Sequence, residues 1–230
     1  MTYALSIEVL KTFSLLAELD DQELASLASV ARQKTYLKGS FLVLQGNPGE
    51  ACYLIVAGKA KVFIQGANGR ELILTWLRAG DFFGEMALFD DQPRSASVQV
   101  TEEATVMILP KQEFLAQVKG SGTLLFKLLL ALCRRLRGAD ERLADLAYLE
   151  TYQRIAKALL LLGKAVGGPG QAGEILRFKR PTHQELADMV GTSRETVTRV
   201  VNTLAHQGYL TLHGPEVAIQ PALLEYLDAL

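Results

Sequence analysis

Cysteine is scarce in this sequence, and long apolar runs are missing from it. The 230 residues include two cysteines, Cys52 and Cys133, too few for a disulfide framework, a metal-ligand spacing or a four-thiolate iron–sulfur cluster. The densest apolar run, residues 124–132, is short and is interrupted by Lys127, so we expect no membrane span. No basic segment followed by an apolar one opens the chain, so we expect no signal peptide. These absences favour a globular protein of the cytoplasm.

Histidine is scarce as well, and familiar catalytic motifs are missing. All three histidines lie in residues 183–213, which leaves none in the preceding regions to bind haem. No HExxH, P-loop or Gly-x-Ser-x-Gly element occurs. We therefore expect no metal and no enzyme, including one that hydrolyses cyclic nucleotides. The net charge is −1, and a mild basic bias over residues 175–213 is weak evidence for nucleic acid on its own.

The pattern of apolar and polar residues changes from the first part of the chain to the next. Residues 4–31 are expected to be helical, because Asp20 followed by Glu23 forms a capping-box pattern before an apolar periodic run. Over residues 35–110, glycines recur at near-regular spacing between short runs in which apolar and polar residues alternate. Such runs between turn residues are typical of a compact antiparallel barrel or roll.

Residues 111–149 carry a helical heptad pattern. Positions four and three residues apart are filled by Leu125, Leu129, Leu132, Leu136, Ala139, Leu143 and Leu146. One interpretation is a helix packed on its own domain. A sustained heptad seam flanked by charged residues favours the other, a helix that pairs two chains. Glycines near residues 120–122 predict that this helix is bent or starts late.

Residues 150–230 combine several helix-turn-helix signals. After an expected loop over residues 163–174, Thr182 and Glu185 form a capping box for a first helix, and Gly191 supplies a turn with positive φ. Thr192 or Ser193 would cap the second helix. Gly214-Pro215 between two short apolar runs suggests a hairpin wing, and Pro221 opens a terminal helix.

The second helix would expose residues suited to DNA. It begins with Ser193, Arg194, Glu195, Thr196 and Arg199. Arginine suits the N7 and O6 atoms of guanine, glutamate accepts from cytosine N4, and hydroxyls suit phosphates. An ordinary helical hairpin with a solvated charged face is the alternative. The joint occurrence of caps, glycine turn and base-reading side chains favours DNA binding by this helix.

The stretch "GEMALFDDQPRSASV" (84–98) places an acid and a base among small and apolar residues. The guanidinium of Arg94 could pair a phosphate with two parallel donors, and the carboxylate of Glu85 could accept from a hydroxyl. Gly84 would let the backbone come close to a ligand. The alternative is an internal Glu85–Arg94 salt bridge that serves only the fold, although it would leave Ser95 unexplained.

These stretches resemble the Crp/Fnr transcription regulators, most closely the cyclic-AMP receptor branch. "GTSRETVTRVVNTLAHQGYL" (191–210) resembles the family's recognition motif, and "GEMALFDDQPRSA" (84–96) its phosphate-binding cassette. The resemblance covers nearly the whole chain. It implies an α+β fold with an antiparallel β-roll over residues 1–110, a dimerisation helix over 111–149 and a winged helix-turn-helix over 150–230. It also implies a homodimer that binds double-stranded DNA and RNA polymerase.

The resemblance assigns roles to particular residues. Arg94 and Ser95 would bind the phosphate of cyclic AMP, Glu85 the ribose 2′-hydroxyl, and backbone groups of Gly84 and Met86 the sugar-phosphate. Arg135 would lie near the phosphate. Arg194, Glu195 and Arg199 would read bases of a TGTGA half-site, and Ser193 and Thr196 would touch phosphates. The remaining candidates at the DNA are Thr182 and Gln184.

One departure from the family lies in the long helix. The threonine and serine that read adenine in the family fall on Ala139 and Asp140. The identity of the nucleobase, and the need for a nucleotide at all, therefore stay open. A regulator that binds DNA without an effector is the close alternative. A regulatory module of a kinase or channel is disfavoured by the helix-turn-helix pattern.

Overall fold

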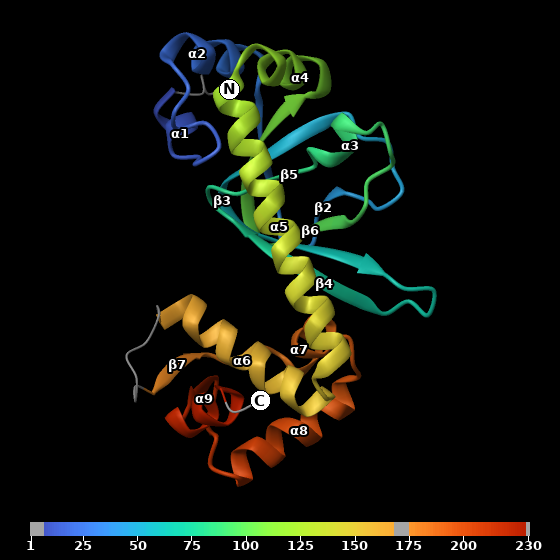
Figure 1. Cartoon of the computed structure of the whole chain (residues 1–230), viewed down its shortest axis with the longest axis vertical. Helices are drawn as coiled ribbons and strands as arrows, with labels where there is room; N and C mark the ends of the chain where they lie inside the picture. Colours follow the sequence, from blue (N-terminus) through green and yellow to red (C-terminus); the bar gives the residue numbers. More distant parts are fainter. Residues whose placement is uncertain (1–6, 168–174, 229–230) are drawn as a thin grey trace. The chain divides into compact units, whose positions relative to one another are not determined.

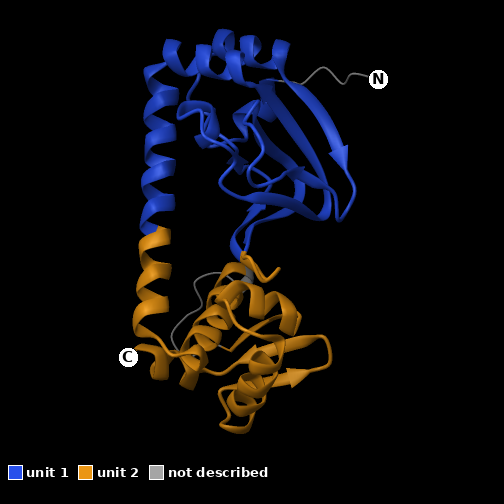
Figure 2. Ribbon diagram, turned by 90° about the vertical axis from the view of Figure 1, so that its right-hand side faces the viewer, with its two compact units in different colours: residues 1–65, 73–137 blue, residues 66–72, 138–230 orange. Residues whose placement is uncertain are grey.

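The computed structural model describes residues 7–167 and 175–228, which form two compact units (Figure 2). Residues 1–65 and 73–137 make the first unit, and residues 66–72 and 138–230 make the second. The division falls inside the long helix α5 (Gly122–Tyr148), after Arg137. The expected three-part division, with boundaries after residues 110 and 149, stays a proposal.

The first unit is an antiparallel roll with helices at its ends (Figure 1). Its sheet has the strand order β1-β6-β3-β4, with β2 paired to β6 and β5 paired to β3. The strands are β1 (Arg32–Tyr36), β2 (Phe41–Val43), β3 (Ala51–Gln65), β4 (Glu71–Arg78), β5 (Phe82–Phe83) and β6 (Ser97–Pro110). The helices before α5 are α1 (Ile7–Lys11), α2 (Asp21–Val30), α3 (Met86–Phe89) and α4 (Lys111–Gly120). The roll expected from the glycine-punctuated region is confirmed.

Two apolar clusters hold this unit together. One fills the space between the N-terminal helices, α4 and the start of α5, and includes the fully buried Leu10, Phe13 and Phe114. The other fills the inside of the roll, where Ile55, Val100 and Val106 point inward. The capping box of Asp20 and Glu23 begins α2 as predicted, but residues 12–19 form turns rather than continuous helix.

Helix α5 has one covered and one uncovered side. Leu124 and Leu128 are buried against the helix's own unit. The seam positions Leu125, Leu129, Leu136, Leu143 and Leu146 are each at least half exposed, and Leu132 is partly buried. The predicted bend is present, because α4 ends at Gly120 and α5 begins at Gly122 with a change of direction of 108°.

In the part of the chain that the structure describes, no single helix is long and apolar enough to cross a membrane. Only α4 and α5 taken together, across their 108° bend, have that length and composition.

The second unit is a helix-turn-helix with a three-stranded sheet. Its helices are α6 (Thr151–Gly167), α7 (His183–Val190), α8 (Arg194–His206) and α9 (Pro221–Asp228). The strands β7 (Leu176–Lys179), β9 (Glu216–Ile219) and β8 (Leu210–His213) lie side by side in this order. The hairpin of β8 and β9 is the wing expected around Gly214, while β7 was not predicted. One core joins α6, α7, α8 and the sheet, with Ile155, Leu186 and Val197 at its centre.

The expected loop over residues 163–174 is partly wrong. Helix α6 continues to Gly167, and residues 168–174 lie outside the described residues. Gly163 is a packing residue rather than a loop residue, since a Cβ there would lie 3.0 Å from the Phe178 ring. A glycine chosen for close contact within a helix cannot be told from a loop glycine by sequence.

Candidate ligand pocket and nucleic-acid interface

The stretch over residues 84–98 folds around the buried guanidinium of Arg94. Its Nη1 donates to the carbonyl of Gly84 at 2.5 Å and its Nη2 donates to the carbonyl of Ala51 at 2.7 Å. The residue is 5% exposed. Among the described residues no carboxylate forms a salt bridge with it. Burying a cation that has no counter-ion is costly, which makes this position receptive to an anion.

Glu85, next to it in the chain, is also buried, with 1% exposure. Its Oε1 accepts a hydrogen bond of 2.5 Å from Nη1 of Arg135 on α5. Its Oε2 has no hydrogen-bond partner. The alternative that Glu85 pairs with Arg94 is therefore wrong, because the carboxylate takes its cation from a distant helix. Among the described residues, one buried carboxylate oxygen is left without a hydrogen-bond donor.

Gly84 makes this arrangement possible. Its φ of +84° is a left-handed conformation that side chains disfavour. A Cβ at this position would lie 2.6 Å from Nη1 of Arg94. Gly84 thus provides both the turn and the space that its carbonyl and the guanidinium share.

Aromatic side chains complete the surroundings of the two arginines. The Arg94 guanidinium lies 5.6 Å from the centre of the Tyr53 ring, which stacks on Phe83 at 4.9 Å. Arg135 lies 4.6 Å from the Phe82 ring. Burial raises the pKa of the Tyr53 hydroxyl, and the positive charge of Arg94 opposes this rise. Sequence reasoning missed Tyr53, which carries no motif and reaches the site through strand pairing.

Burial also keeps the nearby thiol of Cys52 protonated. Desolvation raises the pKa of Cys52, and the charge of Glu85 adds to the rise. Cys52 is therefore an apolar core residue near the charged side chains of Glu85, Arg135 and Arg94.

The other predicted ligand residues differ in position. Met86 is half exposed at the start of α3, and Ser95 is exposed. Ala139 and Asp140 are exposed on α5, about one helical turn beyond Arg135, within the second unit. The structure thus brings Gly84, Glu85, Arg94 and Arg135 together, and the roles of the remaining residues stay predictions.

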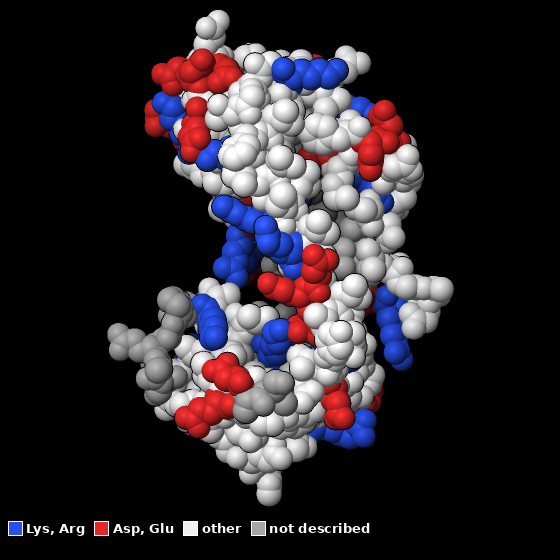
Figure 3. Space-filling view, in the orientation of Figure 1, with Lys and Arg blue, Asp and Glu red and all other residues white. Residues whose placement is uncertain are grey.

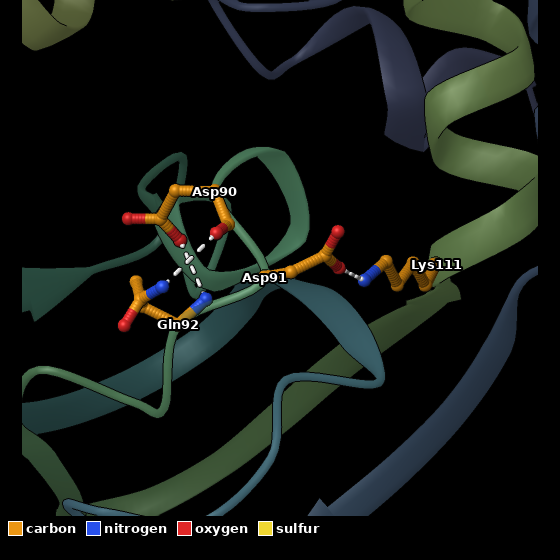
Figure 4. Close-up of polar contacts among 4 residues, drawn as sticks. All are labelled: Asp90, Asp91, Gln92 and Lys111. Carbon is orange, nitrogen blue, oxygen red and sulfur yellow. Dashed lines mark hydrogen bonds and ion pairs between the residues drawn. The ribbon is translucent and has the colours of Figure 1, made fainter.

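A shallow pocket lies on the far end of the same stretch. Its volume is about 260 Å³, and Gly49, Ala87, Gln92 and Lys111 are among its lining residues. In Figure 4 the ammonium of Lys111, at the start of α4, points to the carboxylate of Asp91, and Gln92 bonds Asp90. This ion pair connects the end of the cassette to α4.

In the second unit, α7 and α8 have the predicted caps. Thr182 and Glu185 form a capping box at α7, and Gly191 ends that helix with a φ of +69°. Ser193 caps α8 by accepting from the amide of Thr196 at 3.1 Å. Arg194, Glu195 and Arg199 are exposed. The helix start is therefore presented to solvent, with the side chains predicted to read bases outside the core.

Local hydrogen bonds order the polar residues of α8. The hydroxyls of Ser193 and Thr196 lie 3.0 Å apart, and Arg199 approaches Thr196 at 3.4 Å. The pKa of Glu195 is lowered by a hydrogen bond from its own backbone amide, with help from the Ser193 hydroxyl. Glu195 is thus an acceptor at neutral pH, as contact with cytosine N4 would require.

A second pocket opens at the start of α7. Its volume is about 430 Å³, and it is lined by Arg180, Pro181, Thr182, His183, Gln184 and Arg194. Burial lowers the pKa of His183, and the charges of Arg180 and Arg194 lower it further. Sequence reasoning missed Arg180 and His183. The signal that could have found this pocket is Arg180, a basic residue just before the capping box of Thr182 and Glu185.

Charge gathers in no single patch on the face drawn in Figure 3. Acidic and basic side chains occur in small separate groups on each unit, so the local arrangement around α7 and α8 identifies the interface better than overall charge does. Among residues 7–167 and 175–228 there is no group of three His, Cys, Asp or Glu side chains suited to a metal ion.

Two family models match the regions of the chain that contain these candidate sites. The model of the cyclic nucleotide-binding domain matches residues 33–121, and the model of the Crp-like helix-turn-helix domain matches residues 153–226. The chain is 32% identical over 213 residues to the CRP-like cAMP-activated global transcriptional regulator of Mycobacterium tuberculosis, covering 92% of this chain and 94% of that one. It is 35% identical to the cyclic AMP receptor protein of Thermus thermophilus, covering 88% and 90%.

Solved structures share the fold. The c-di-GMP responsive regulator CLP of Xanthomonas campestris superposes with a TM-score of 0.76 at 24% identity, covering 87% of this chain and 99% of that one. The catabolite activator protein of Thermus thermophilus has a TM-score of 0.53 at 34% identity, covering 94% and 98%. The curated relative of this chain from Mycobacterium tuberculosis is named as a transcriptional regulator. With a cyclic nucleotide-binding domain followed by a DNA-binding helix-turn-helix, the chain belongs to the Crp-like transcription regulators.

Proposed function

We propose that this regulator binds cyclic AMP in the roll and, as a homodimer, binds two-fold symmetric DNA sites with TGTGA-like arms. The observation that supports the nucleotide is a pair of buried groups in the cassette, a cation without a counter-ion and a carboxylate oxygen without a donor. Arg94 is a buried cation without a carboxylate partner, and Glu85 keeps one buried oxygen without a donor. A cyclic nucleotide offers what both groups lack, a phosphate anion and a ribose hydroxyl.

The names of relatives support the same effector. The relatives from Mycobacterium tuberculosis and Thermus thermophilus are named for cyclic AMP, whereas the structural neighbour from Xanthomonas campestris is named for c-di-GMP. The geometry of Arg94 and Glu85 suits a phosphate and a ribose and does not depend on the base. We assign cyclic AMP from the relatives, and the phosphate–ribose contacts from the residues.

The exposed leucines of α5 support the dimer. An apolar stripe from Leu125 to Leu146, mostly exposed among the described residues, is the pattern that two helices bury against each other. Two chains related by a two-fold axis present two copies of α8, which suits a palindromic operator with half-sites about one helical turn apart. Arg194, Glu195 and Arg199 would read its base edges. RNA polymerase is the expected partner at the promoter, in the cytoplasm.

A second candidate is a regulator that binds DNA without a nucleotide. Two observations favour it. Glu85 is already paired with Arg135, and Ala139, in the place of a residue that reads adenine, has no side-chain hydrogen bond to offer. On this alternative, the internal contacts of Arg94 and Arg135 would hold the roll in its DNA-competent form.

The experiment that tests the proposal measures the affinity of the purified protein for a labelled palindromic duplex, with and without saturating cyclic AMP, and with cyclic GMP as the control nucleotide. Specific binding that cyclic AMP strengthens supports the first candidate. Specific binding that no nucleotide changes supports the second. Equal affinity for the palindrome and a scrambled duplex contradicts both.

A further inference from the structure

The contacts of the His183 ring indicate which of its two nitrogens carries a hydrogen in the neutral form. The hydroxyl of Thr198 donates to the carbonyl of Arg194 at 2.9 Å, which uses its one hydrogen. The same hydroxyl oxygen lies 2.8 Å from Nδ1 of His183. With its hydrogen directed at Arg194, the hydroxyl accepts from Nδ1, and on this assignment Nδ1 carries the ring hydrogen. In the neutral ring Nε2 is then a bare lone pair, and Nε2 gains a hydrogen only when the ring is a cation.

The surroundings of this ring are positive. His183 lines the pocket of about 430 Å³ together with Arg180 and Arg194, and neither arginine forms a salt bridge among the described residues. On α7 itself, Glu185 is engaged in the capping box with Thr182. The charges that lower the pKa of the ring, after burial, are Arg180 and Arg194, and none comes from α6, the other helix packed on α7.

This pocket has the composition of a phosphate site. Arg180 and Arg194 line it, and with Arg194 assigned to a base edge, Arg180 is the guanidinium left for an anion. The pocket opens at the start of α7, where the first backbone N–H groups and the helix dipole favour an anion. In a helix-turn-helix the first helix lies across the DNA backbone. A DNA phosphate is therefore the ligand that the position and chemistry of the pocket fit.

We propose that His183 binds a DNA backbone phosphate at this pocket only as the imidazolium, which donates a hydrogen bond from Nε2. Each subunit then takes up a proton at Nε2 when it binds DNA. The inference rests on the proposed DNA-binding function. A phosphate oxygen has lone pairs but no hydrogen to give, so it meets repulsion from the bare Nε2 of the neutral ring. Thr198 enforces this condition by holding the hydrogen at Nδ1.

The direction of the pH effect follows. In the free protein burial, and after it the charges of Arg180 and Arg194, disfavour the imidazolium, whereas a bound phosphate favours it, so binding raises the pKa of His183. Affinity for DNA is then strongest at low pH and falls as the pH rises through the pKa of the bound state. One proton per subunit limits the change in Kd to about tenfold per pH unit for each subunit.

The test is a titration of a fluorescent palindromic duplex with the full-length protein between pH 5.5 and 8.5 at constant ionic strength. We expect the Kd of the parent to rise by about three- to tenfold from pH 6 to pH 8. His183→Gln should bind with a Kd that does not change over this range. His206→Gln and His213→Gln, at the other two histidines, are the controls and should keep the slope of the parent.

A second variant separates the ring's hydrogen from its mere presence. Thr198→Val keeps the shape but removes the acceptor, so the neutral ring is free to carry its hydrogen at Nε2. We expect a shallower pH profile and tighter binding than the parent at pH 8. Calorimetry in two buffers of different ionisation enthalpy should detect proton uptake by the parent and none by His183→Gln.

The outcomes distinguish this inference from the function on which it rests. Specific DNA binding by the parent with a flat pH profile, or an unchanged slope in His183→Gln, overturns the role of His183 and leaves DNA binding intact. A slope in Thr198→Val identical to the parent's overturns the fixed hydrogen at Nδ1. A parent without specific DNA binding at any pH overturns the proposed function, and this inference with it.

Discussion

Arg135 on α5 donates a hydrogen bond of 2.5 Å to the buried carboxylate of Glu85, fifty residues earlier in the chain. The arginine side chain is 41% exposed and that of the glutamate 1%. The acceptor proposed for a ribose hydroxyl is thus also the anchor of the long helix. Glu85 and Arg135 therefore form a charge pair that links the cassette to α5. Any ligand that contacts Glu85 would change the electrostatic surroundings of Arg135.

Removing Arg135 alone should lower stability more than removing both charges of the pair. Arg135→Leu leaves Glu85 as a buried carboxylate without a cation, and we expect the free energy of unfolding to fall by about 1–3 kcal/mol, less than for a fully buried pair because solvent screens Arg135. The double variant Glu85→Gln/Arg135→Leu should recover part of the loss, since the uncompensated charge is gone. Urea unfolding of the four proteins of this cycle gives the coupling. Additive losses would mean that the pair contributes no specific stability.

Arg94→Leu should abolish binding of cyclic AMP. It removes the buried cation, and it also frees the carbonyls of Gly84 and Ala51, which should lower stability by about 1–3 kcal/mol. The exposed Arg78→Leu on β4 is the control and should bind as the parent does. Isothermal calorimetry measures binding, and a thermal melt shows that the roll remains folded. Parent-like affinity in folded Arg94→Leu would remove this residue from the site.

The seam of α5 should be needed for pairing. Leu132→Asp/Leu136→Asp would place two carboxylates in the buried centre of a helix pair, where charges without partners are strongly disfavoured. We expect sedimentation velocity to find monomers. Leu37→Asp, at an exposed leucine away from α5, should leave the dimer unchanged. A dimer that persists in the double variant would move the interface to another surface.

Arg194 should discriminate one guanine in each half-site. Arg194→Ala is expected to weaken binding to the specific duplex by about 1–3 kcal/mol and to relax the preference at that guanine. Duplexes with this base pair exchanged provide the matched test, because the parent should lose affinity for them while Arg194→Ala should not. If the parent and the variant lose affinity equally, Arg194 contacts only the backbone.

Ala139 should limit the response to cyclic AMP. One missing neutral hydrogen bond is worth about 0.5–1.5 kcal/mol, so we expect appreciable DNA binding without the nucleotide and modest stimulation by it. Ala139→Thr should increase the stimulation, and Ala144→Thr on the same helix should not. The measurement is DNA affinity with and without saturating cyclic AMP. A parent that is inert alone and stimulated more than about a hundredfold, ~2.7 kcal/mol of coupling, contradicts this prediction.

Much of the fold could be predicted because its signals are local. The capping boxes at Asp20 and Thr182, the left-handed Gly191 and the exposed leucine seam each depend on residues within a few positions of one another. Helix caps and periodicity are encoded over such distances. The bend between α4 and α5 likewise followed from neighbouring glycines.

The parts that escaped prediction depend on long-range packing. Pairing of Glu85 with Arg135 rather than Arg94 follows from how α5 lies on the roll, which no spacing encodes. Gly163 was interpreted as a loop residue because its close neighbour, Phe178, is distant in sequence. The contact between the His183 ring and Thr198 depends on the packing of α7 on α8. In each case the residues were visible in the sequence, and their partners were not.

The uncovered leucine stripe of α5 also bears on how much of the protein must be present before it acts. A lone chain leaves the stripe in water and carries one α8, whereas a pair hides the stripe and matches both arms of an operator. Because mass action ties pairing to abundance, occupancy of a palindrome by such a chain grows with the square of its concentration while monomers predominate. Pairing through the stripe, as proposed, would therefore make operator occupancy fall more steeply than the amount of protein when expression is low.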